Sequence, residues 1–261
     1  MRTALTIAGS DSGGGAGIQA DLKTFAAHRV FGTSAITAIT AQNTNGVQAW
    51  QAVAVELVTA QIQAVVSDIG AHAVKIGMLG NAAIVRAVAR AIEDLALVNV
   101  VVDPVMIAKG GDRLLLEDAV AELRTSLLPR AHIVTPNIPE AEILAGRPIR
   151  SPDDMRAAAE RIRELGPRVV IVKGGHAEGP QCIDVVCAGN GTFEVKGPRI
   201  ATRNTHGTGC TLSSAIAANL ANGMEDEAAI RGARAYLEGA LRTAPAIGAG
   251  HGPLNHMWRL Y

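Results

Sequence analysis

The chain has 261 residues, of which 48% are hydrophobic and 18% are charged, so it can bury a sizeable core. Its 24 lysines and arginines balance 24 aspartates and glutamates, and only 3% of its residues are aromatic, which argues against a nucleic-acid-binding or anionic-membrane surface. Three cysteines without a CxxC pair argue against a disulfide framework and a zinc knuckle. The first residues reach glycine too soon for a signal peptide, and no apolar run could span a membrane, so we expect a soluble cytoplasmic protein.

In the first part of the chain, short apolar runs alternate with segments of helical periodicity. Residues 5–8 predict a buried strand, and the glycine-rich segment 9–17 leads into a helix marked by Ile18, Leu22 and Phe25. Further strands are expected at residues 34–41, 50–55, 73–76 and 98–102. Helical stripes run over residues 58–69 and 84–95.

The second part of the chain continues this alternation. A helix is predicted over residues 119–128, a strand at 132–134, and a second helix begins at the N-cap Ser151. After a strand at 169–172, two runs separated by Gly189-Asn190-Gly191 predict a β-hairpin. Helices over 212–220 and 228–240 complete the chain. The pattern predicts an α/β fold with a mostly parallel sheet and helices on both faces, in one domain spanning residues 1–261.

The unusual residues of the sequence follow the ends of these strands. Ligands of such sheets bind beyond the carboxyl ends of the strands, where these residues would converge. They are residues 9–17, Gln42, Gly77-Met78, Asp103, Asn137, Glu140, Lys173 and 207–210. The convergence favours a small-molecule enzyme over a binding module. The glycine-rich segment matches neither GxGxxG nor the Walker A motif, because Ile18 breaks the first spacing and no Gly-Lys-Ser/Thr occurs.

The segment Thr205-His206-Gly207-Thr208-Gly209-Cys210 precedes the helical run 212–220. Its glycines allow a tight turn, and the first-turn N–H groups of a helix lack intrahelical partners, so this end suits a phosphate or another developing anion. A thiol at a helix N-terminus has a lowered pKa, so we expect the Cys210 thiolate to be accessible near neutral pH. The alternative is a helix start with a small apolar cysteine.

Three charged residues at strand ends predict phosphoryl transfer. Asp103 ends an apolar strand, where a carboxylate is costly unless it is paired or metal-bound, and with Glu140 it could hold Mg²⁺. Lys173 could pair with a transferring phosphate. Each has a plain structural alternative: a turn aspartate before proline, a helix-starting glutamate and a solvated lysine. The seven histidines lack metal-binding spacing, and we do not expect His206 and Cys210 to bind a metal.

The chain resembles the hydroxymethylpyrimidine/phosphomethylpyrimidine kinases of thiamine biosynthesis, which are ribokinase-like. The resemblance covers nearly the whole sequence and is carried by several long motifs in the same order. They are residues 8–21, 40–44, 75–79, 102–106, 135–140, 172–176, 206–210 and 252–256. It implies a three-layer kinase that uses ATP and Mg²⁺ and phosphorylates 4-amino-5-hydroxymethyl-2-methylpyrimidine first to the monophosphate and then to the diphosphate.

The resemblance also assigns roles to individual residues. Gln42 falls on the position of the family's substrate-binding glutamine, whose amide matches an aminopyrimidine edge. Met78 is expected to line the ring pocket, with Gly9 and, as a weaker candidate, Asp21 as further substrate contacts. Asn137, Thr205 and Thr208 are predicted to bind ATP, and Asp103 and Glu140 to hold Mg²⁺.

Catalysis is predicted to depend on Lys173 and on the anion hole of Gly207, Gly209 and Cys210. Most ribokinase-like enzymes have an aspartate base where this chain has Cys210, so we assign Cys210 as the base of the first step. The second acceptor is already an ionised phosphate and should need a base less.

Two other functions remain open from the sequence. A pyridoxal or pyridoxine kinase would phosphorylate a hydroxymethyl group on a similar flat ring, and a regulatory domain would bind the pyrimidine without turnover. The presence of Asp103, Glu140, Lys173 and Cys210 argues against the regulatory domain. The resemblance alone suggests a homodimer. Residues 9–17 and 107–113 are both candidates for a lid.

Overall fold

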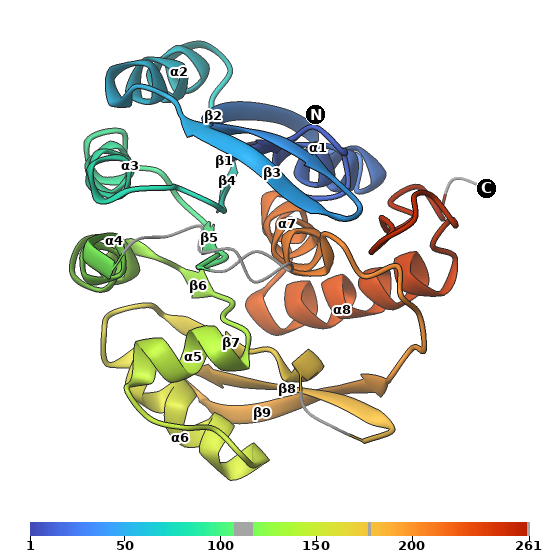
Figure 1. The fold of residues 1–261 in the computed structure, drawn as a ribbon. Coiled ribbons are helices and arrows are strands. Elements are labelled where there is room, and N and C mark those ends of the chain that lie inside the picture. The colour runs from blue at the N-terminus through green and yellow to red at the C-terminus, as the bar shows by residue number, and fades with distance from the viewer. Residues whose placement is uncertain (107–116, 177–178, 260–261) are drawn as a thin grey trace.

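The computed structural model describes residues 1–106, 117–176 and 179–259. Nine strands form its sheet (Figure 1): β1 (Thr3–Asp11), β2 (Phe31–Asn43), β3 (Gly46–Ala52), β4 (Ala73–Ile76), β5 (Val100–Val102), β6 (Ile133–Val134), β7 (Val169–Val172), β8 (Gln181–Ala188) and β9 (Gly191–Pro198). The α-helices are α1 (Gly17–Ala27), α2 (Val55–Asp68), α3 (Ala82–Asp94), α4 (Glu117–Glu122), α5 (Ile138–Ala145), α6 (Pro152–Arg163), α7 (Thr208–Ala221) and α8 (Asp226–Arg242).

The strands lie in the order β3-β2-β1-β4-β5-β6-β7-β8-β9. The six strands from β2 to β7 pair in parallel, while β3 at one edge and the β8–β9 hairpin at the other are antiparallel. The central strands β4, β5 and β7 are buried along their whole length, as expected for apolar runs that are covered on both faces.

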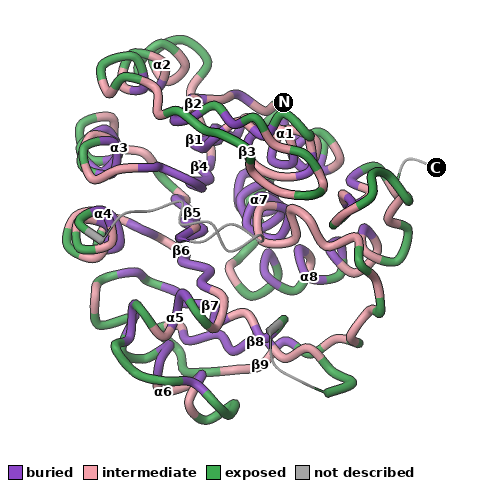
Figure 2. The backbone as a smooth tube through the Cα atoms, in the orientation of Figure 1, coloured by how far each residue is buried: buried purple, intermediate pink, exposed green. Residues whose placement is uncertain are grey.

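Alternation along the strands divides the core into two layers. On one face, Val74, Val102 and Val170 pack against helices α2 to α6. On the other face, Ala73, Val101 and Val169 pack against α1, α7 and α8. Figure 1 shows these two groups of helices on opposite sides of the sheet, and Figure 2 shows the buried backbone concentrated in the strands and in α7. The structure therefore confirms the predicted ribokinase-like three-layer fold.

The predicted elements correspond to observed ones, with differences at their ends. Ser151 caps α6 by accepting a hydrogen bond from the N–H of Asp154, and the predicted hairpin is β8–β9. The expected helix over 119–128 is less regular: α4 continues into a π-helical turn at Leu123–Leu127 and a 3-10 turn at Leu128–Arg130. Pro129 lacks the N–H that would continue the α-helical ladder, which accounts for the change of winding there.

The parallel strands place the chemistry-bearing residues together. Strands β1, β4, β5 and β7 run in the same direction, so their carboxyl ends lie at one edge of the sheet. Asp11 is the last residue of β1, and Gly77, Asp103 and Lys173 come directly after β4, β5 and β7. The amino end of α7 meets the same edge, because Gly209 approaches Asp103 and Lys173. This edge therefore brings together segments that are far apart in the chain. Asp11 and His206, for example, are 195 residues apart in the sequence and are joined there by a hydrogen bond.

Candidate active site

A cavity of about 460 Å³ opens at this edge of the sheet. Twelve of the thirteen predicted site residues border it: Gly9, Gln42, Met78, Asp103, Asn137, Glu140, Lys173, Thr205, Gly207, Thr208, Gly209 and Cys210. Ser10, Asp11, Thr40, Lys75 and His206 also border the cavity and were not predicted as site residues. The structure therefore brings the predicted residues together at one cavity and adds a second set of polar side chains to its lining.

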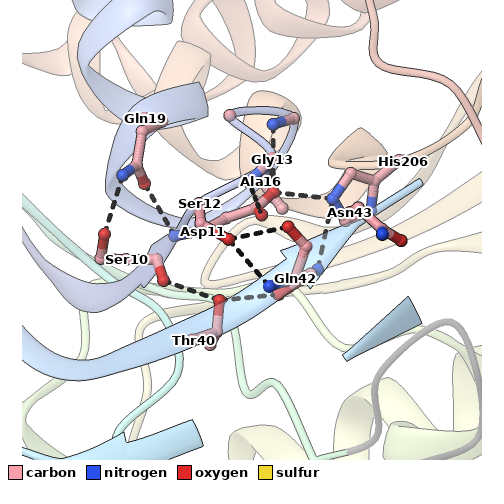
Figure 3. A network of polar contacts seen from close by, with 12 residues as sticks. Ser10, Asp11, Ser12, Gly13, Ala16, Gln19, Thr40, Gln42, Asn43 and His206 are labelled. Atoms are coloured by element: carbon pink, nitrogen blue, oxygen red, sulfur yellow. Dashed lines mark hydrogen bonds and ion pairs between the residues drawn. The ribbon is translucent and has the colours of Figure 1, made fainter. Parts of the chain in front are cut away.

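The glycine-rich turn of residues 12–16 is held by the carboxylate of Asp11. Its two oxygens accept hydrogen bonds from the N–H groups of Gly13, Gly15 and Ala16 at 2.8–3.0 Å, and His206 Nε2 donates to it at 2.8 Å. Figure 3 shows Gly13, Ala16 and His206 around this carboxylate. Burial alone would raise the pKa of Asp11, but the hydrogen bonds from His206 and the backbone outweigh it and lower the pKa. The turn is therefore fixed by an ionised side chain.

Gln42 belongs to the same polar network as Asp11 and His206 (Figure 3). Thr40 Oγ1 donates to its Oε1 at 3.2 Å, and its Nε2 lies 3.3 Å from His206 Nε2. Its backbone N–H donates to Ser12 Oγ, which in turn donates to the Gln42 carbonyl. The amide of Gln42 is thus oriented by its protein neighbours.

An apolar wall lies beside Gln42. Met78 is almost fully buried and packs with Ala38 and Val105, and a Cβ on Gly9 would lie only 3.2 Å from the Met78 sulfur. Glycine at position 9 therefore lets the backbone of β1 approach the methionine closely. The cavity therefore has an apolar surface at Met78 and a polar edge at the Gln42 amide.

The anion hole is built on Gly207 at the N-cap of α7. Gly207 has φ of +82°, and a Cβ there would overlap the carbonyl of Gly15, so the glycine-rich turn and the start of α7 touch through glycine alone. A Cβ on Gly209 would come within 3.2 Å of both Asp103 Oδ2 and Lys173 Nζ. The first turn of α7 therefore faces an ion pair across a narrow gap, and the N–H groups of such a turn lack partners within the helix.

Asp103, Lys173 and Glu140 form a buried charge cluster. Lys173 Nζ donates to Asp103 Oδ1 at 2.7 Å, and Thr135 Oγ1 donates to the same oxygen at 3.3 Å. Burial alone would lower the pKa of Lys173, but Asp103 and Glu140 raise it above its usual value. Burial raises the pKa of Glu140 to about 7, although Lys173 opposes the change. The lysine therefore stays charged beside the two carboxyl groups.

Asn137 and Glu140 also have a structural role. They form a capping box at the start of α5, in which Asn137 Oδ1 accepts from the Glu140 N–H and Glu140 Oε2 accepts from the Asn137 N–H. Glu140 therefore starts helix α5, as the structural alternative predicted, and it also borders the cavity.

The carboxylates at the cavity fit a Mg²⁺ ion that is bound jointly by protein side chains and phosphate oxygens. Asp103 and Glu140 supply carboxylate oxygens, and no cluster of three or more potential metal-ligating side chains occurs in the described part of the chain. Mg²⁺ is commonly held by one or two carboxylates together with waters and phosphate oxygens, so two carboxylates beside an anion hole are sufficient. Lys173 and the N-terminus of α7 supply the positive surroundings that phosphates require.

The expected thiolate of Cys210 is contradicted by its surroundings. Burial raises the pKa of Cys210 to about 11, because it outweighs the favourable charge of Lys75 and a hydrogen bond from the Gly17 N–H. The carboxylates of Asp21 and Asp103 raise it further. The sequence showed the helix N-terminus but not these nearby charges, so the resting side chain is a thiol rather than a thiolate.

Asp21, the weaker of the predicted substrate contacts, does not border the cavity. Its carboxylate is fully buried, lies outside the cavity lining and accepts hydrogen bonds from Lys75 Nζ, Thr6 Oγ1 and Ser214 Oγ. Position 21 follows the glycine-rich turn in the chain, but on α1 it faces the core. The second lid candidate, residues 107–113, lies outside the described residues, and residues 9–17 are held by the Asp11 network.

The residues that sequence reasoning missed carried a signal of their own. Lys75 interrupts an apolar strand, where a charge is costly unless it is paired, and it is indeed fully buried beside Asp21. Asp11 is the last residue of β1, and after Ser12 it is followed by the run Gly13–Gly17 of four glycines and one alanine, a position that suits a turn-holding carboxylate. His206 belongs to the motif 206–210 but has no predicted role of its own, and its partner Asp11 lies 195 residues away, which no local pattern reveals.

Comparison with known proteins agrees with this geometry. Residues 11–255 match the family described as phosphomethylpyrimidine kinase. The hydroxymethylpyrimidine/phosphomethylpyrimidine kinase of Bacillus subtilis (strain 168) is 49% identical over 254 residues, which cover 97% of this chain and 94% of the relative.

Solved structures show the same fold. An ADP complex of Bacillus subtilis pyridoxal kinase superposes with a TM-score of 0.93 at 37% identity and covers all of both chains. The phosphomethylpyrimidine kinase of Clostridium difficile 630 superposes with a TM-score of 0.82 at 44% identity, over 91% of this chain and 98% of the other. In the part of the chain that the structure describes, no helix combines the length and apolarity needed to span a membrane.

Proposed function

The chain belongs to the phosphomethylpyrimidine kinase family, and from this premise we propose that it is the bifunctional kinase of thiamine biosynthesis. It transfers the γ-phosphoryl group of ATP to 4-amino-5-hydroxymethyl-2-methylpyrimidine and, in a second step, to the resulting monophosphate. One observation carries the proposal: three groups of residues border the same cavity. They are the first turn of α7, the Asp103–Lys173–Glu140 cluster, and the pair Gln42 and Met78.

The parts of the cavity divide the work of phosphoryl transfer. Gln42 holds the polar edge of the pyrimidine, and Met78 with Gly9 covers its face. The first-turn N–H groups at Gly207 and Gly209, together with Lys173, stabilise the charge of the transferring phosphoryl group. Asn137, Thr205 and Thr208 border the same cavity and are proposed to bind ATP, which agrees with the ADP bound by the related pyridoxal kinase.

Asp103 and Glu140 are proposed to hold Mg²⁺ with the phosphate oxygens of the nucleotide. When bound, the ion would neutralise charge on those oxygens. The pKa of Glu140 near 7 means that metal binding would displace a proton from this side chain at neutral pH.

Cys210 is proposed as the base that accepts the hydroxyl proton in the first step. With a pKa of about 11 only a small fraction is thiolate at neutral pH, so the first step should accelerate as the pH rises. The second acceptor is an ionised phosphate monoester and carries no proton that must be removed.

A coupled assay of ADP formation tests the proposal with three parallel acceptors: the hydroxymethylpyrimidine, its monophosphate and pyridoxal. We expect turnover with both pyrimidines and little with pyridoxal. A Cys210→Ala variant should lose about 100-fold or more in the first step and less in the second. Cys182→Ala is the matched control, since Cys182 does not border the cavity. Full first-step activity of Cys210→Ala would reject the base.

Pyridoxal is the acceptor that separates this proposal from its nearest alternative. The similarity to pyridoxal kinase extends over the whole chain, so the phosphate machinery cannot distinguish the two activities. Turnover with pyridoxal alone would preserve the kinase and overturn the proposed role of Gln42. A protein that binds the pyrimidine without forming ADP would instead be a regulatory domain.

The remaining proposals concern the protein as a whole. We propose that residues 1–261 form one kinase domain, which the continuous nine-stranded sheet supports. A cytoplasmic homodimer is proposed from the family resemblance, and sedimentation of the purified protein tests the dimer.

A further inference from the structure

The side-chain amide of Gln42 lies between two polar neighbours that border the cavity with it (Figure 3). His206 Nε2 is 3.3 Å from the amide nitrogen, and Thr40 Oγ1 is 3.2 Å from the amide oxygen. The two ends of an amide have nearly the same shape, so its hydrogen-bond partners decide which end is the oxygen. The protons that these two neighbours carry therefore show which direction of the amide they favour.

His206 Nε2 already has an acceptor. It lies 2.8 Å from Asp11 Oδ2, which also accepts hydrogen bonds from the backbone N–H groups of Gly15 and Ala16. An ionised carboxylate can only accept, so the proton of the contact with Asp11 belongs to His206 Nε2. A Gln42 nitrogen beside the same His206 nitrogen sets two N–H donors against each other. An amide oxygen in that place would instead share the His206 N–H with Asp11 in a three-centre hydrogen bond.

The Thr40 hydroxyl meets a similar conflict at the other end of the amide. Its Oγ1 lies 2.9 Å from the carbonyl oxygen of Ser10, which can only accept, so the single hydroxyl proton is directed there. A Gln42 oxygen beside the same hydroxyl has to compete for that proton. An amide nitrogen in that place would donate to a lone pair of the hydroxyl oxygen, and no proton would be shared.

We infer that His206 and Thr40 are positioning residues that hold the Gln42 amide with its oxygen toward His206 and its nitrogen toward Thr40. This direction removes both conflicts, and the opposite direction keeps both. The consequence for the substrate rests on the proposed function. The 4-amino group of the pyrimidine would donate to the amide oxygen on the His206 side, and the adjacent ring nitrogen would accept from the amide nitrogen on the Thr40 side.

A held amide selects one order of donor and acceptor on the ring. A 4-oxo pyrimidine has a carbonyl in place of the amino group and a ring N–H in place of the accepting nitrogen, so its edge is reversed. Against the held amide of Gln42, oxygen would face oxygen and N–H would face N–H. Polar groups that are left without a partner in a site are costly, so the site should reject the reversed edge.

Neutron diffraction from crystals of the deuterated protein tests the direction of the amide without any substrate. We expect two deuterons on the amide atom beside Thr40 and none on the amide atom beside His206. One deuteron is expected on His206 Nε2, directed at Asp11. Deuterons on the amide atom beside His206 would overturn the inference.

Acceptor preference tests the consequence for the substrate. The quantity compared is the ratio of kcat/KM for 5-hydroxymethyl-2-methylpyrimidine carrying a 4-amino group to that for the same ring carrying a 4-oxo group. The double variant His206→Phe with Thr40→Val keeps similar shapes but removes both partners of the amide, which can then turn to match either edge. We expect the ratio to fall about 10-fold or more, whereas Thr40→Ser, which keeps the hydroxyl, should preserve it.

Ser12→Ala is the matched control. Ser12 Oγ accepts from the backbone N–H of Gln42 at 2.8 Å and donates to its carbonyl at 2.7 Å, so this variant loosens the same residue but leaves the two neighbours of the amide in place. It should lower both values of kcat/KM and leave their ratio unchanged. An equal change of the ratio in the control and in the double variant, or no change in either, would mean that His206 and Thr40 only support the loop.

The unaltered protein separates a failure of this inference from a failure of the proposed function. If it formed no ADP with the 4-amino compound, the proposed function and the substrate contact would both be overturned. The neutron experiment decides the direction of the Gln42 amide in either case, since it depends on no activity.

Discussion

At the scale of single residues, glycine is needed at positions 207 and 209 of the proposed anion hole for two different physical reasons. Gly207 has a positive φ, and a side chain there would overlap the Gly15 carbonyl, so it is required by the backbone. Gly209 lies in the first turn of α7, where an ordinary side chain would be tolerated by the helix. Its constraint comes from the gap to Asp103 and Lys173. One glycine therefore serves the fold, and the other serves the space in which phosphate is proposed to bind.

Gly209→Ala should separate these two constraints. A methyl group would meet Asp103 and Lys173 at 3.2 Å and narrow the phosphate site, so we expect kcat to fall about 10-fold or more. Alanine favours helix more than glycine by up to about 1 kcal/mol, so thermal unfolding should show no loss of stability beyond that range. Gly207→Ala, by contrast, should lower both activity and the melting temperature. Full activity of Gly209→Ala would show that phosphate does not use this gap.

Gln42→Glu should test recognition of the pyrimidine edge. The carboxylate keeps the size of the amide but can no longer donate a hydrogen bond, and an unpaired polar group costs about 1–3 kcal/mol. We therefore expect kcat/KM for the hydroxymethylpyrimidine to fall about 10- to 100-fold, while KM for ATP changes little. A change confined to ATP would place Gln42 on the nucleotide side of the cavity.

At the scale of elements, the β8–β9 hairpin is fastened to α8 and to the Lys173 turn by one buried carboxylate. Asp184 Oδ2 accepts from Arg234 Nη1 at 2.6 Å, and Asp184 Oδ1 accepts from the N–H of Gly174 at 2.9 Å. Both charged side chains are almost fully buried. Strand β8 thus holds the residue that directly follows Lys173, which ties an antiparallel edge of the sheet to the charge cluster.

Asp184→Ala should be strongly destabilising. It leaves the Arg234 guanidinium buried without its main partner, and breaking a buried pair in this way costs about 3–5 kcal/mol. The double variant Asp184→Leu with Arg234→Met removes both charges, and urea unfolding should show that it recovers a large part of the loss. If the single and double variants were equally unstable, the hydrogen bond to Gly174, rather than the unpaired charge, would be the main contribution.

At the scale of the whole molecule, the C-terminal residues fasten the layer of α1, α7 and α8. Tyr236 Oη donates to the carbonyl of His256, Trp258 Nε1 donates to the carbonyl of Tyr236, and His256 Nε2 lies 3.0 Å from Thr211 Oγ1. His206 pairs with Pro253 as an isolated bridge, so the same segment supports the loop before the anion hole. Burial lowers the pKa of His256 to about 4.

The stability of the protein should therefore fall in acid. Between pH 6.5 and about 4 the unfolded chain protonates His256 and the folded chain does not, so protonation favours unfolding as the pH falls through this window. The full effect below pH 4 is up to about 3 kcal/mol. His28 has a pKa lowered by burial and acts in the same direction. His256→Gln should reduce the slope of unfolding free energy against pH, measured by urea titration. An equal slope in the variant would mean that other groups cause it.

The sequence by itself determined the sheet, the layers and the edge where the site lies. Apolar runs such as 98–102 and helical stripes such as 84–95 are local patterns, and parallel strands bring their ends together whatever the details. Because the unusual residues all followed strand ends, twelve of the thirteen predicted site residues border one cavity. Their chemical roles remain proposals.

Only the tertiary structure decided which charges face one another. The sequence placed Asp21 after a glycine-rich turn and Cys210 at a helix start, but it could not show that α1 turns Asp21 into the core against Lys75, 54 residues away. Burial reverses the expected direction of the Cys210 pKa; the carboxylates of Asp21 and Asp103 act in the same direction, and Lys75 opposes them. A local pattern fixes secondary structure because its forces act between near neighbours, whereas a pKa depends on every charge within reach and on the water that folding excludes.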